Sequence, residues 1–228
     1  MIAIVPARGG SKGLPGKNIR AMADKPMIAH TILEALKSKY INEVIVSTDD
    51  QVIADIADEY GASCPFIRPD NLSQDDSLAV DNYIYTIDRL NKDFGYSIDD
   101  FIVLQPTSPL RTVGDIDGAI ELFKSKNADS VISYVQETHP VSWHKYINED
   151  NRFEDIFQNK LLNRQDCRES YYPNGAIYVF KYSLIKSRQY YSENSFAFIM
   201  PKNRSVDIDY IDDFEYAEFL LRKRNAKK

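Results

Sequence analysis

Short apolar runs alternate along this chain with stretches in which apolar residues recur every three or four positions. The short runs are rich in β-branched residues and predict strands at 2–6, 44–47, 65–67, 101–104, 130–135, 176–180 and 205–208. The periodic stretches predict helices over 26–36, over 52–60 with Gly61 as the C-terminal stop, and over 116–123. Such alternation is typical of a mostly parallel, Rossmann-like α/β sheet with covering helices and right-handed crossovers.

The segment 136–172 follows neither period. It mixes Trp143, Tyr146, Phe153 and Phe157 with charged residues. Large aromatic residues on a polar excursion often anchor interfaces between subunits. We therefore expect one domain over 1–228 with a protruding arm at about 136–172. The alternative is a loop that packs on the edge of its own sheet.

The composition indicates a globular protein and argues against membrane-spanning and nucleic-acid-binding classes. The 228 residues, 43% of them hydrophobic, are enough for one substantial core. No apolar run reaches eighteen residues, and the chain opens directly into a predicted strand, so we expect a cytoplasmic protein without a membrane span. Cys64 and Cys167 lie too far apart in sequence to suggest a metal clip. A net charge of −6 argues against nucleic acid as a partner.

The N-terminal segment is positively charged, although the chain as a whole is negatively charged. The first 23 residues carry four cations, Arg8, Lys12, Lys17 and Arg20, and no acid. They belong to a glycine-rich turn that follows the first predicted strand and contains Ala7, Arg8, Gly9, Gly10, Ser11 and Lys12. Glycines let backbone N–H groups approach an anion, and a strand-to-helix turn is the usual position of a nucleotide's phosphates. The turn therefore predicts a triphosphate site, with a flexible turn bearing solvated lysines as the alternative.

A second charged feature lies near the C-terminus. Asp207 and Asp209 are two apart in a predicted strand, which places both carboxylates on one face, about 6.5 Å apart along the backbone. Two carboxylates beside a nucleotide's phosphates make a typical Mg²⁺ site, in which water completes the coordination. The alternative is a pair of solvated acids on an edge strand.

Six blocks in order give the chain a family resemblance. They are the turn at 7–18, IVSTDD at 45–50, RPxxLxxD at 68–75, LQPTSPLR at 104–111, NGAIY at 174–178 and VDID at 206–209. The chain resembles the bacterial N-acylneuraminate cytidylyltransferases, which make CMP-activated sialic acids and related nonulosonates. The resemblance implies that CTP and a nine-carbon α-keto acid sugar give a CMP-sugar and pyrophosphate.

The resemblance also implies roles for the nucleotide-binding residues. Arg8, Lys12 and Lys17 would hold the triphosphate, with Lys17, Asn18 and Asp209 at the reacting centre. Asp207 and Asp209 would bind Mg²⁺, with Mn²⁺ as a possible substitute. Arg68 would help to read the cytosine, and Asp75 lies in the turn after it. Many family members have Thr-Ala-Ser-Ser where this chain has Asp76-Ser77-Leu78-Ala79, so we place the hydroxyl contact at Ser77.

The acceptor sugar would meet Gln105, Arg111, Arg164 and Tyr178. Gln105 and Arg111 could instead tie down their own loop. The resemblance implies a homodimer, and Arg164 on the arm would hold the sugar carboxylate either within one chain or across the dimer. Phe196 and Phe198 would line an N-acyl pocket or belong to the core.

Two questions stay open at this stage. Tyr172 replaces an arginine found in some relatives, so the acceptor is N-acetylneuraminate, legionaminate or a related sugar. The sequence also allows two other functions. One is a glycosyltransferase, whose metal-binding D-x-D matches Asp207 and Asp209, and the other is a non-catalytic nucleotide-binding module.

Overall fold

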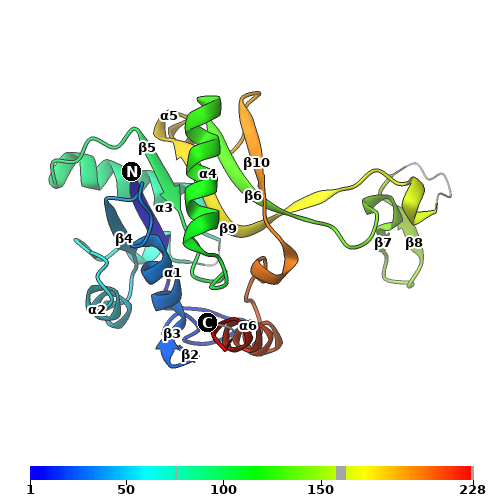
Figure 1. The fold of residues 1–228 in the computed structure, drawn as a ribbon, viewed down its shortest axis with the longest axis horizontal. Coiled ribbons are helices and arrows are strands. Elements are labelled where there is room, and N and C mark those ends of the chain that lie inside the picture. Colours follow the sequence, from blue (N-terminus) through cyan, green and yellow to red (C-terminus); the bar gives the residue numbers. More distant parts are fainter. Residues whose placement is uncertain (75, 158–162, 227–228) are drawn as a thin grey trace.

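A computed structural model describes residues 1–74, 76–157 and 163–226. Its centre is a six-stranded sheet of order β10-β6-β9-β5-β1-β4 (Figure 1). The strands are β1 (Ile2–Pro6), β4 (Glu43–Ser47), β5 (Asp100–Val103), β6 (Ser130–Gln136), β9 (Tyr171–Lys181) and β10 (Ser195–Ile199). β9 runs antiparallel to both of its neighbours, while the other pairings are parallel. The predicted mostly parallel α/β sheet is therefore confirmed.

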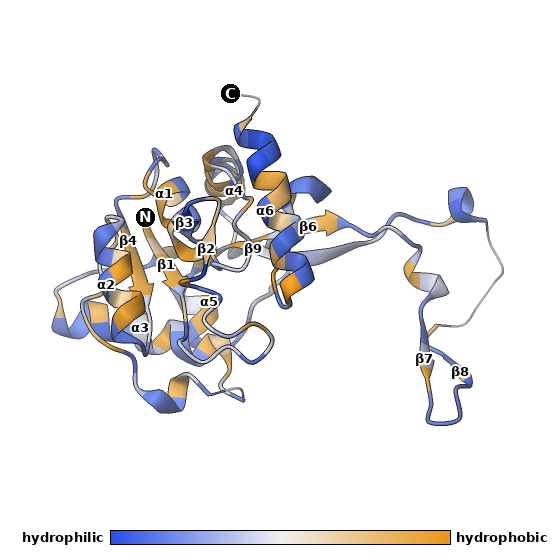
Figure 2. Ribbon diagram, turned by 90° about the horizontal axis from the view of Figure 1, so that it is seen from below, coloured by the Kyte–Doolittle hydropathy of each residue, from blue (hydrophilic) through white to orange (hydrophobic). Residues whose placement is uncertain are grey.

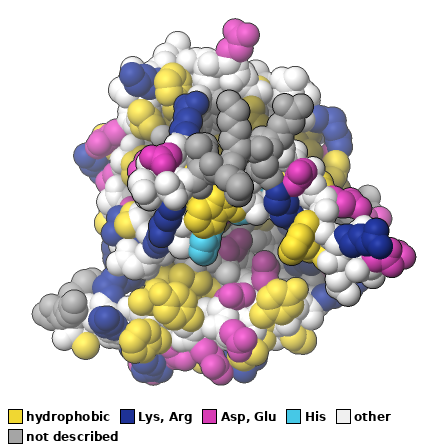
Figure 3. Space-filling view, turned by 90° about the vertical axis from the view of Figure 1, so that its right-hand side faces the viewer, with side chains coloured by type: hydrophobic (Ala, Val, Ile, Leu, Met, Phe, Trp, Pro, Cys, Tyr) yellow, Lys and Arg dark blue, Asp and Glu magenta, His cyan; other side chains and the backbone are white. Residues whose placement is uncertain are grey.

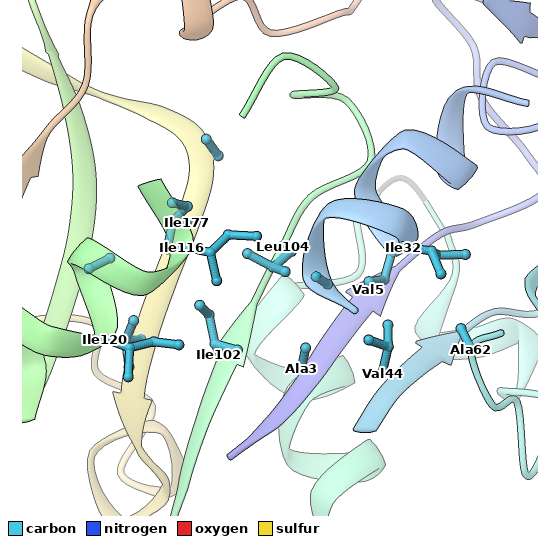
Figure 4. Packing of buried hydrophobic residues seen from close by; sticks show 14 of the residues in the cluster. Ala3, Val5, Ile32, Val44, Ala62, Ile102, Leu104, Ile116, Ile120 and Ile177 are labelled. Carbon is cyan, nitrogen blue, oxygen red and sulfur yellow. The ribbon is translucent and has the colours of Figure 1, made fainter. Parts of the chain in front are cut away.

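Helices cover both faces of the sheet because successive strand residues point to opposite sides. Ala3 and Val5 face α1 (Met27–Ala35), α2 (Gln51–Glu59) and α4 (Val113–Lys126), as Figure 4 shows in part. Ile4 faces α3 (Ala79–Asp93) and α5 (Tyr182–Lys186). Orange strands inside and blue outer helix faces in Figure 2 reflect the same division. Both cores consist of buried hydrophobic side chains and place the ends of the strands, where loops emerge, in fixed positions.

Local signals explain where the helices begin and end. Asp50 caps α2 because its carboxylate accepts hydrogen bonds from the amides of Val52 and Ile53. Gly61 has a φ of +88°, the left-handed conformation expected of a glycine after a helix. The helix predicted at 52–60 therefore ends where the sequence places its end.

Two predicted strands are wrong. Residues 65–67 form no strand, and the sheet meets this region only through a bridge between Ile45 and Ser63. Residues 205–208 are irregular and follow a short 3₁₀ turn, Lys202–Arg204. The edge position belongs to β10, whose Phe196 and Phe198 pack toward α4 in the core and away from any sugar pocket.

Two short hairpins complete the chain between the main elements. β2 (Ala21–Met22) and β3 (Lys25–Pro26) separate the glycine-rich turn from α1, while α6 (Ile211–Asn225) closes the described chain. β7 (Lys145–Ile147) and β8 (Phe153–Asp155) lie on an arm that projects from the far ends of β6 and β9 (Figure 1). Among the described residues, no helix is both long and apolar enough to span a membrane.

The arm exposes apolar side chains. Tyr146 is 63% exposed and Phe153 is 79% exposed, and Val141, Trp143, Ile147 and Phe157 are exposed as well. Figure 3 looks onto this side of the molecule, where hydrophobic side chains gather between charged ones. The arm predicted at 136–172 therefore projects from the sheet, and its role in dimerisation stays a prediction.

Candidate active site

A cavity of about 460 Å³ opens at the carboxyl ends of β1 and β5. This is the edge at which parallel α/β sheets bind ligands. The glycine-rich turn leaves β1 there and LQPTSPLR leaves β5 there. Several of the predicted site residues line the cavity, namely Arg8, Ser11, Lys12, Lys17, Asn18, Arg68, Ser77, Gln105 and Asp209.

The glycine-rich turn is held against the next loop of the sheet. The Gly9 amide donates to Asp49 Oδ1 at 3.1 Å, and a Cβ at Gly9 would lie 2.6 Å from Asp50 Oδ2. The buried Asn18 donates from Nδ2 to the Arg8 carbonyl at 3.0 Å. Asn18 therefore holds the two ends of the turn together as well as lining the cavity. Ala7, Gly9 and Gly10 belong to the same turn but are not among the residues that line the cavity, and their contact with a nucleotide stays a prediction.

The acidic segment meets this turn. Lys17 Nζ donates to the Ile208 carbonyl at 2.8 Å and lies 3.6 Å from Asp209 Oδ1. The Ile208 amide donates to the Thr107 carbonyl at 2.9 Å, so this segment is fixed to the loop after β5 as well. The cationic turn and Asp209 thus share one cavity wall, although the predicted strand at 205–208 does not form.

Asp207 lies on the other side of the same segment, toward Gln105 and Gly175. Gly175 has a φ of +74°, and a Cβ there would lie 3.1 Å from Asp207 Oδ2 and 3.0 Å from Gln105 Oε1. Burial raises the pKa of Asp207 and the charge of Asp209 adds to this, while a hydrogen bond from Thr107 opposes it. The two aspartates therefore face different neighbours, Lys17 for Asp209 and Gln105 for Asp207.

Arg68 closes the opposite end of the cavity. It is buried, donating from Nε to Ser73 Oγ at 2.9 Å and from Nη1 to the Ser47 carbonyl at 3.1 Å. Its Nη2 lies 3.6 Å from Asp49 Oδ1. Burial lowers the pKa of Arg68, and Asp49 opposes that shift. Ser77 lines this end, with its hydroxyl donating to the Asn71 carbonyl, while Asp75 lies outside the described residues.

Arg111 lies beneath the site and not in it. Its side chain has no exposed surface and donates to the Ala176 carbonyl, to Thr31 Oγ1 and to the Gln105 carbonyl. Burial lowers its pKa to about 9. The predicted contact between Arg111 and the sugar is corrected by this geometry, because the guanidinium is buried and its described contacts tie the loop of Gln105 to β9 and α1.

Tyr178 lies on β9 beside the acidic segment and is half-buried. Burial raises its pKa to about 12, and the negative charge of Asp207 acts in the same direction. Its ring stacks with that of Phe180 at a centroid distance of 6.0 Å. Tyr178 and Gln105 therefore both lie near Asp207.

Arg164 is a predicted sugar-binding residue that lies on a separate part of the chain from the cavity. It lies on the arm in a 3₁₀ turn, Arg164–Asp166, and its side chain is exposed. A second cavity of about 370 Å³, formed by arm residues alone, is adjacent to it. Within one chain, Arg164 is separate from the site.

The family model described as cytidylyltransferase matches residues 2–226. The chain belongs to the cytidylyltransferase family. It is 36% identical to the CMP-N,N′-diacetyllegionaminic acid synthase of Legionella pneumophila, with 97% of this chain and 96% of that protein covered. It is also 36% identical to an N-acylneuraminate cytidylyltransferase of Streptococcus agalactiae, covering 99% of this chain and 56% of that protein. The chain thus spans about half the length of that streptococcal relative.

Further comparisons agree with this membership. The chain is 32% identical to the pseudaminic acid cytidylyltransferase of Campylobacter jejuni, with 97% and 96% of the two chains covered. A solved CMP:2-keto-3-deoxy-manno-octonic acid synthetase complexed with CTP has the same fold, with a TM-score of 0.73, 18% identity and 98% of each chain covered. The protein is thus a nucleotidyltransferase of the N-acylneuraminate cytidylyltransferase type, which decides against the glycosyltransferase and the non-catalytic module.

A metal ion in this cytidylyltransferase would depend on few protein ligands. Among the described residues, no group of three or more His, Cys, Asp and Glu is placed to hold one. Asp209 lines the cavity, and its side chain is 71% exposed. Asp207 lies two residues earlier on the same segment. Two hard carboxylates that leave room for phosphate oxygens and water fit Mg²⁺, which retains much of its hydration in proteins.

The sequence analysis missed two sets of residues in this cytidylyltransferase. Tyr210 lines the cavity beside Asp209. Tyr134 and Tyr191, whose hydroxyls lie 3.4 Å apart, stand near Tyr178 together with Tyr190. These tyrosines come from segments far apart in sequence, so no local motif unites them. The one signal was the unusual number of tyrosines, 15 in the chain.

Proposed function

We propose that this cytidylyltransferase joins CMP from CTP to the anomeric hydroxyl of a nonulosonic acid, a nine-carbon α-keto acid sugar, and releases pyrophosphate. The observation that carries the proposal is the 3.6 Å approach of Lys17 Nζ to Asp209 Oδ1 at the wall of the cavity. Phosphate-binding cations and metal-binding carboxylates must lie this close if they act on one triphosphate.

The cations of the glycine-rich turn would bind the triphosphate. Arg8, Lys12 and Lys17 all line the cavity on the side of the turn. Their charges would stabilise the leaving pyrophosphate. Lys17, which contacts the acidic segment, and Asn18 next to it in sequence would lie nearest the reacting phosphorus. Arg68 and Ser77, at the other end, would contact the cytidine and orient it.

Asp207 and Asp209 would hold Mg²⁺, or Mn²⁺ in its place. When bound, the ion would supply positive charge at the reacting phosphate and lower the pKa of the attacking hydroxyl. The protein's own part is to hold Asp209 beside Lys17 and Asp207 beside Gln105, which places the two carboxylates between the nucleotide end and the acceptor end.

The acceptor would bind on the Asp207 side, at Gln105 and Tyr178. We favour N-acetylneuraminate or legionaminate, since relatives named for these two sugars share 36% identity with the chain. The tyrosines near Tyr178 would give this end an apolar wall that also carries hydroxyl groups. Such a wall suits a sugar with both acyl and hydroxyl substituents.

The acceptor carboxylate would bind Arg164 of a second copy. Arg164 is exposed on the arm and distant from the cavity of its own chain, and the arm exposes Tyr146 and Phe153. A homodimer in which each arm covers the partner's site would bury these rings and complete the pocket. Sedimentation at micromolar concentration tests this step, and a monomer with full turnover would refute it.

A panel of nonulosonic acids incubated with CTP or UTP in Mg²⁺, with detection of pyrophosphate, tests the proposal. We expect release with CTP and with at least one of N-acetylneuraminate and legionaminate, and little with UTP. The Lys17→Ala variant serves as the inactive control and Lys25→Ala, at an exposed position outside the cavity, as the active one. CTP binding without release across the whole panel would refute the proposed reaction.

A further inference from the structure

A third hydrophobic cluster lies apart from the two cores that flank the sheet. It contains buried residues from the glycine-rich turn, the β2–β3 hairpin, α1, the loop after β5, the acidic segment and α6, namely Leu14, Met22, Met27, Leu110, Ile208, Phe214, Ala217 and Leu221. Leu14 stands between Lys12 and Lys17 in sequence, and Ile208 stands between Asp207 and Asp209. Both are buried, 5% and 0% exposed. The cluster thus packs the phosphate-binding turn and the acidic segment against one another.

The two segments touch directly over a short distance only. A Cβ at Gly13 would lie 2.5 Å from the Asp209 carbonyl oxygen, and Lys17 Nζ donates to the Ile208 carbonyl at 2.8 Å. No strand pairing joins the described residues of the two segments. Their spacing is therefore set mainly by what packs behind them.

That support is α6. Phe214 enters the cluster from this helix, and the Arg20 guanidinium, the fourth cation of the N-terminal segment, lies over its ring at 5.4 Å from the centroid. Asp213 Oδ2 accepts hydrogen bonds from the amides of Asp209 at 3.1 Å and Tyr210 at 2.9 Å. The helix thus holds the end of the acidic segment and the end of the phosphate-binding turn at once.

α6 reaches two further segments. Glu218 Oε1 accepts from the Ala23 amide at 2.8 Å, in the hairpin after the turn, and Arg224 donates to the Leu110 carbonyl at 2.8 Å, in the loop after β5. Figures 1 and 2 both show α6 beside β2 and β3. One helix therefore contacts the glycine-rich turn, the hairpin after it, the loop after β5 and the acidic segment.

We propose that Phe214 and Glu218 are positioning residues, through which α6 sets the distance between the phosphate-binding turn and the acidic pair. The proposal rests on the proposed nucleotidyl transfer for its kinetic test and on the structure alone for its second test. Displacing catalytic groups by about 1 Å costs on the order of a hundredfold in rate. Loosening the packing of α6 should thus reduce kcat strongly, while the two cores that flank the sheet stay folded.

The kinetic test compares Phe214→Ala with Phe123→Ala. Both phenylalanines are buried on helices, 4% and 3% exposed, and Phe123 lies in α4, in the core on one face of the sheet. We expect kcat to fall ten- to hundredfold in Phe214→Ala with a smaller change in KM for CTP, and to stay within twofold in Phe123→Ala. Phe214→Leu should restore most of the rate. Equal losses of kcat in the two alanine variants would overturn the proposal.

Hydrogen exchange provides a test that needs no turnover. We expect Phe214→Ala to raise amide exchange in 9–18 and in 205–210 together, and Phe123→Ala to leave both segments protected. This outcome separates the proposal from the reaction, since it holds even if the panel of sugars gives no pyrophosphate. Faster exchange in only one of the two segments would overturn the coupling.

Glu218→Ala covers the case in which Phe214→Ala does not fold. It removes the bond to the Ala23 amide, together with the ion pair to Arg222 on the same helix, without opening a cavity in the cluster. Glu215→Ala, an exposed acid one turn earlier on the same helix, is the matched control. We expect a several-fold lower kcat and faster exchange in 9–18 for Glu218→Ala alone. Identical behaviour of the two variants would refute the positioning role.

Discussion

Lys17 Nζ lies 3.6 Å from Asp209 Oδ1, although the two residues stand near opposite ends of the chain. Lys17 also donates to the carbonyl of Ile208. The lysine thereby bridges the phosphate-binding turn and the acidic segment before any nucleotide arrives. In the proposed reaction the nucleotide and its metal would take over the ionic contact, while the bond to Ile208 keeps the lysine in place.

Asp209→Ala should lower turnover by about a hundredfold or more and weaken CTP binding far less, because its charge acts at the reacting phosphate. Pyrophosphate release and calorimetric CTP binding measure the two effects. Asp58→Ala, at an exposed position on α2, is the control and should match the wild type. Near-normal turnover of Asp209→Ala in Mg²⁺ would remove this residue from the metal site.

Lys17→Ala should likewise lower turnover strongly, and Lys17→Arg should recover only part of it, since a guanidinium is planar and cannot replace a compact ammonium at two acceptors. Side-chain exposure of Lys17 is 15%, so the site leaves little room for a larger group. Steady-state rates of the two variants check this. A full rate in Lys17→Ala would show that the ammonium acts on neither the phosphate nor the metal.

Gly175→Ala should lower turnover, and the loss should be larger than the decrease in the free energy of unfolding can account for. Gly175 and Gly95 have nearly the same backbone, φ +74° and +75°, so alanine at either costs about 1 kcal/mol. At Gly95 nothing lies within 4 Å of a new Cβ, whereas at Gly175 the methyl group would meet Gln105 Oε1 and Asp207 Oδ2. Urea denaturation should shift similarly in both variants, and only Gly175→Ala should lose turnover.

Arg111→Met should destabilise the fold by about 3 kcal/mol, because the buried carbonyls of Gln105 and Ala176 and the hydroxyl of Thr31 lose their donor. Removing a buried charge offsets part of this cost. Urea denaturation measures the change, and Arg222→Met, with 57% of its side chain exposed, is the control. A free energy of unfolding equal to that of the wild type would contradict the structural role.

Stability should fall as the pH is lowered below about 6.5, in part through His30. Burial lowers the pKa of this imidazole, and the charge of Lys25 and Arg224 adds to the effect, while the hydrogen bond to Met22 and the charge of Glu34 oppose it. Between the two pKa values the imidazole of the unfolded chain is protonated and that of the folded chain is not. The free energy of unfolding therefore decreases as the pH falls below the unfolded pKa of about 6.5. Urea midpoints at pH 7.5 and 5.5 should differ less in His30→Gln than in the wild type.

The parts of the site that the sequence predicts well are those that depend on local pattern. Glycines and cations adjacent in sequence mark the turn after β1, and residues of this turn line the cavity, whereas phosphate binding there stays a prediction. Arg111 was misread because a motif shows which residues occur together and not which side of the loop each one faces. Its guanidinium donates hydrogen bonds to three buried acceptors. These acceptors come together only in the folded chain, where β9 lies beside β5.

The wrong strand at 205–208 has a similar cause. Val206 and Ile208 alternate with aspartates as in a half-buried strand. Ile208 is buried instead against α6, and the amide of Ile208 donates to Thr107 in a loop rather than to a neighbouring strand. Tertiary packing thus produces the same alternation without a sheet. The tyrosines near Tyr178 were missed because β6, β9 and the segment before β10 meet only in the folded chain.

β9 is the one antiparallel strand of the six-stranded sheet, and it enters from the arm at the edge where the cavity opens. Its first residues therefore connect the arm, which precedes them in the chain, to Tyr178, which follows on the same strand. Insertions or substitutions in the arm can alter the sugar end through this strand while the turn after β1 stays unchanged. Such an architecture separates the part of the chain that reaches the arm from the part that forms the turn after β1.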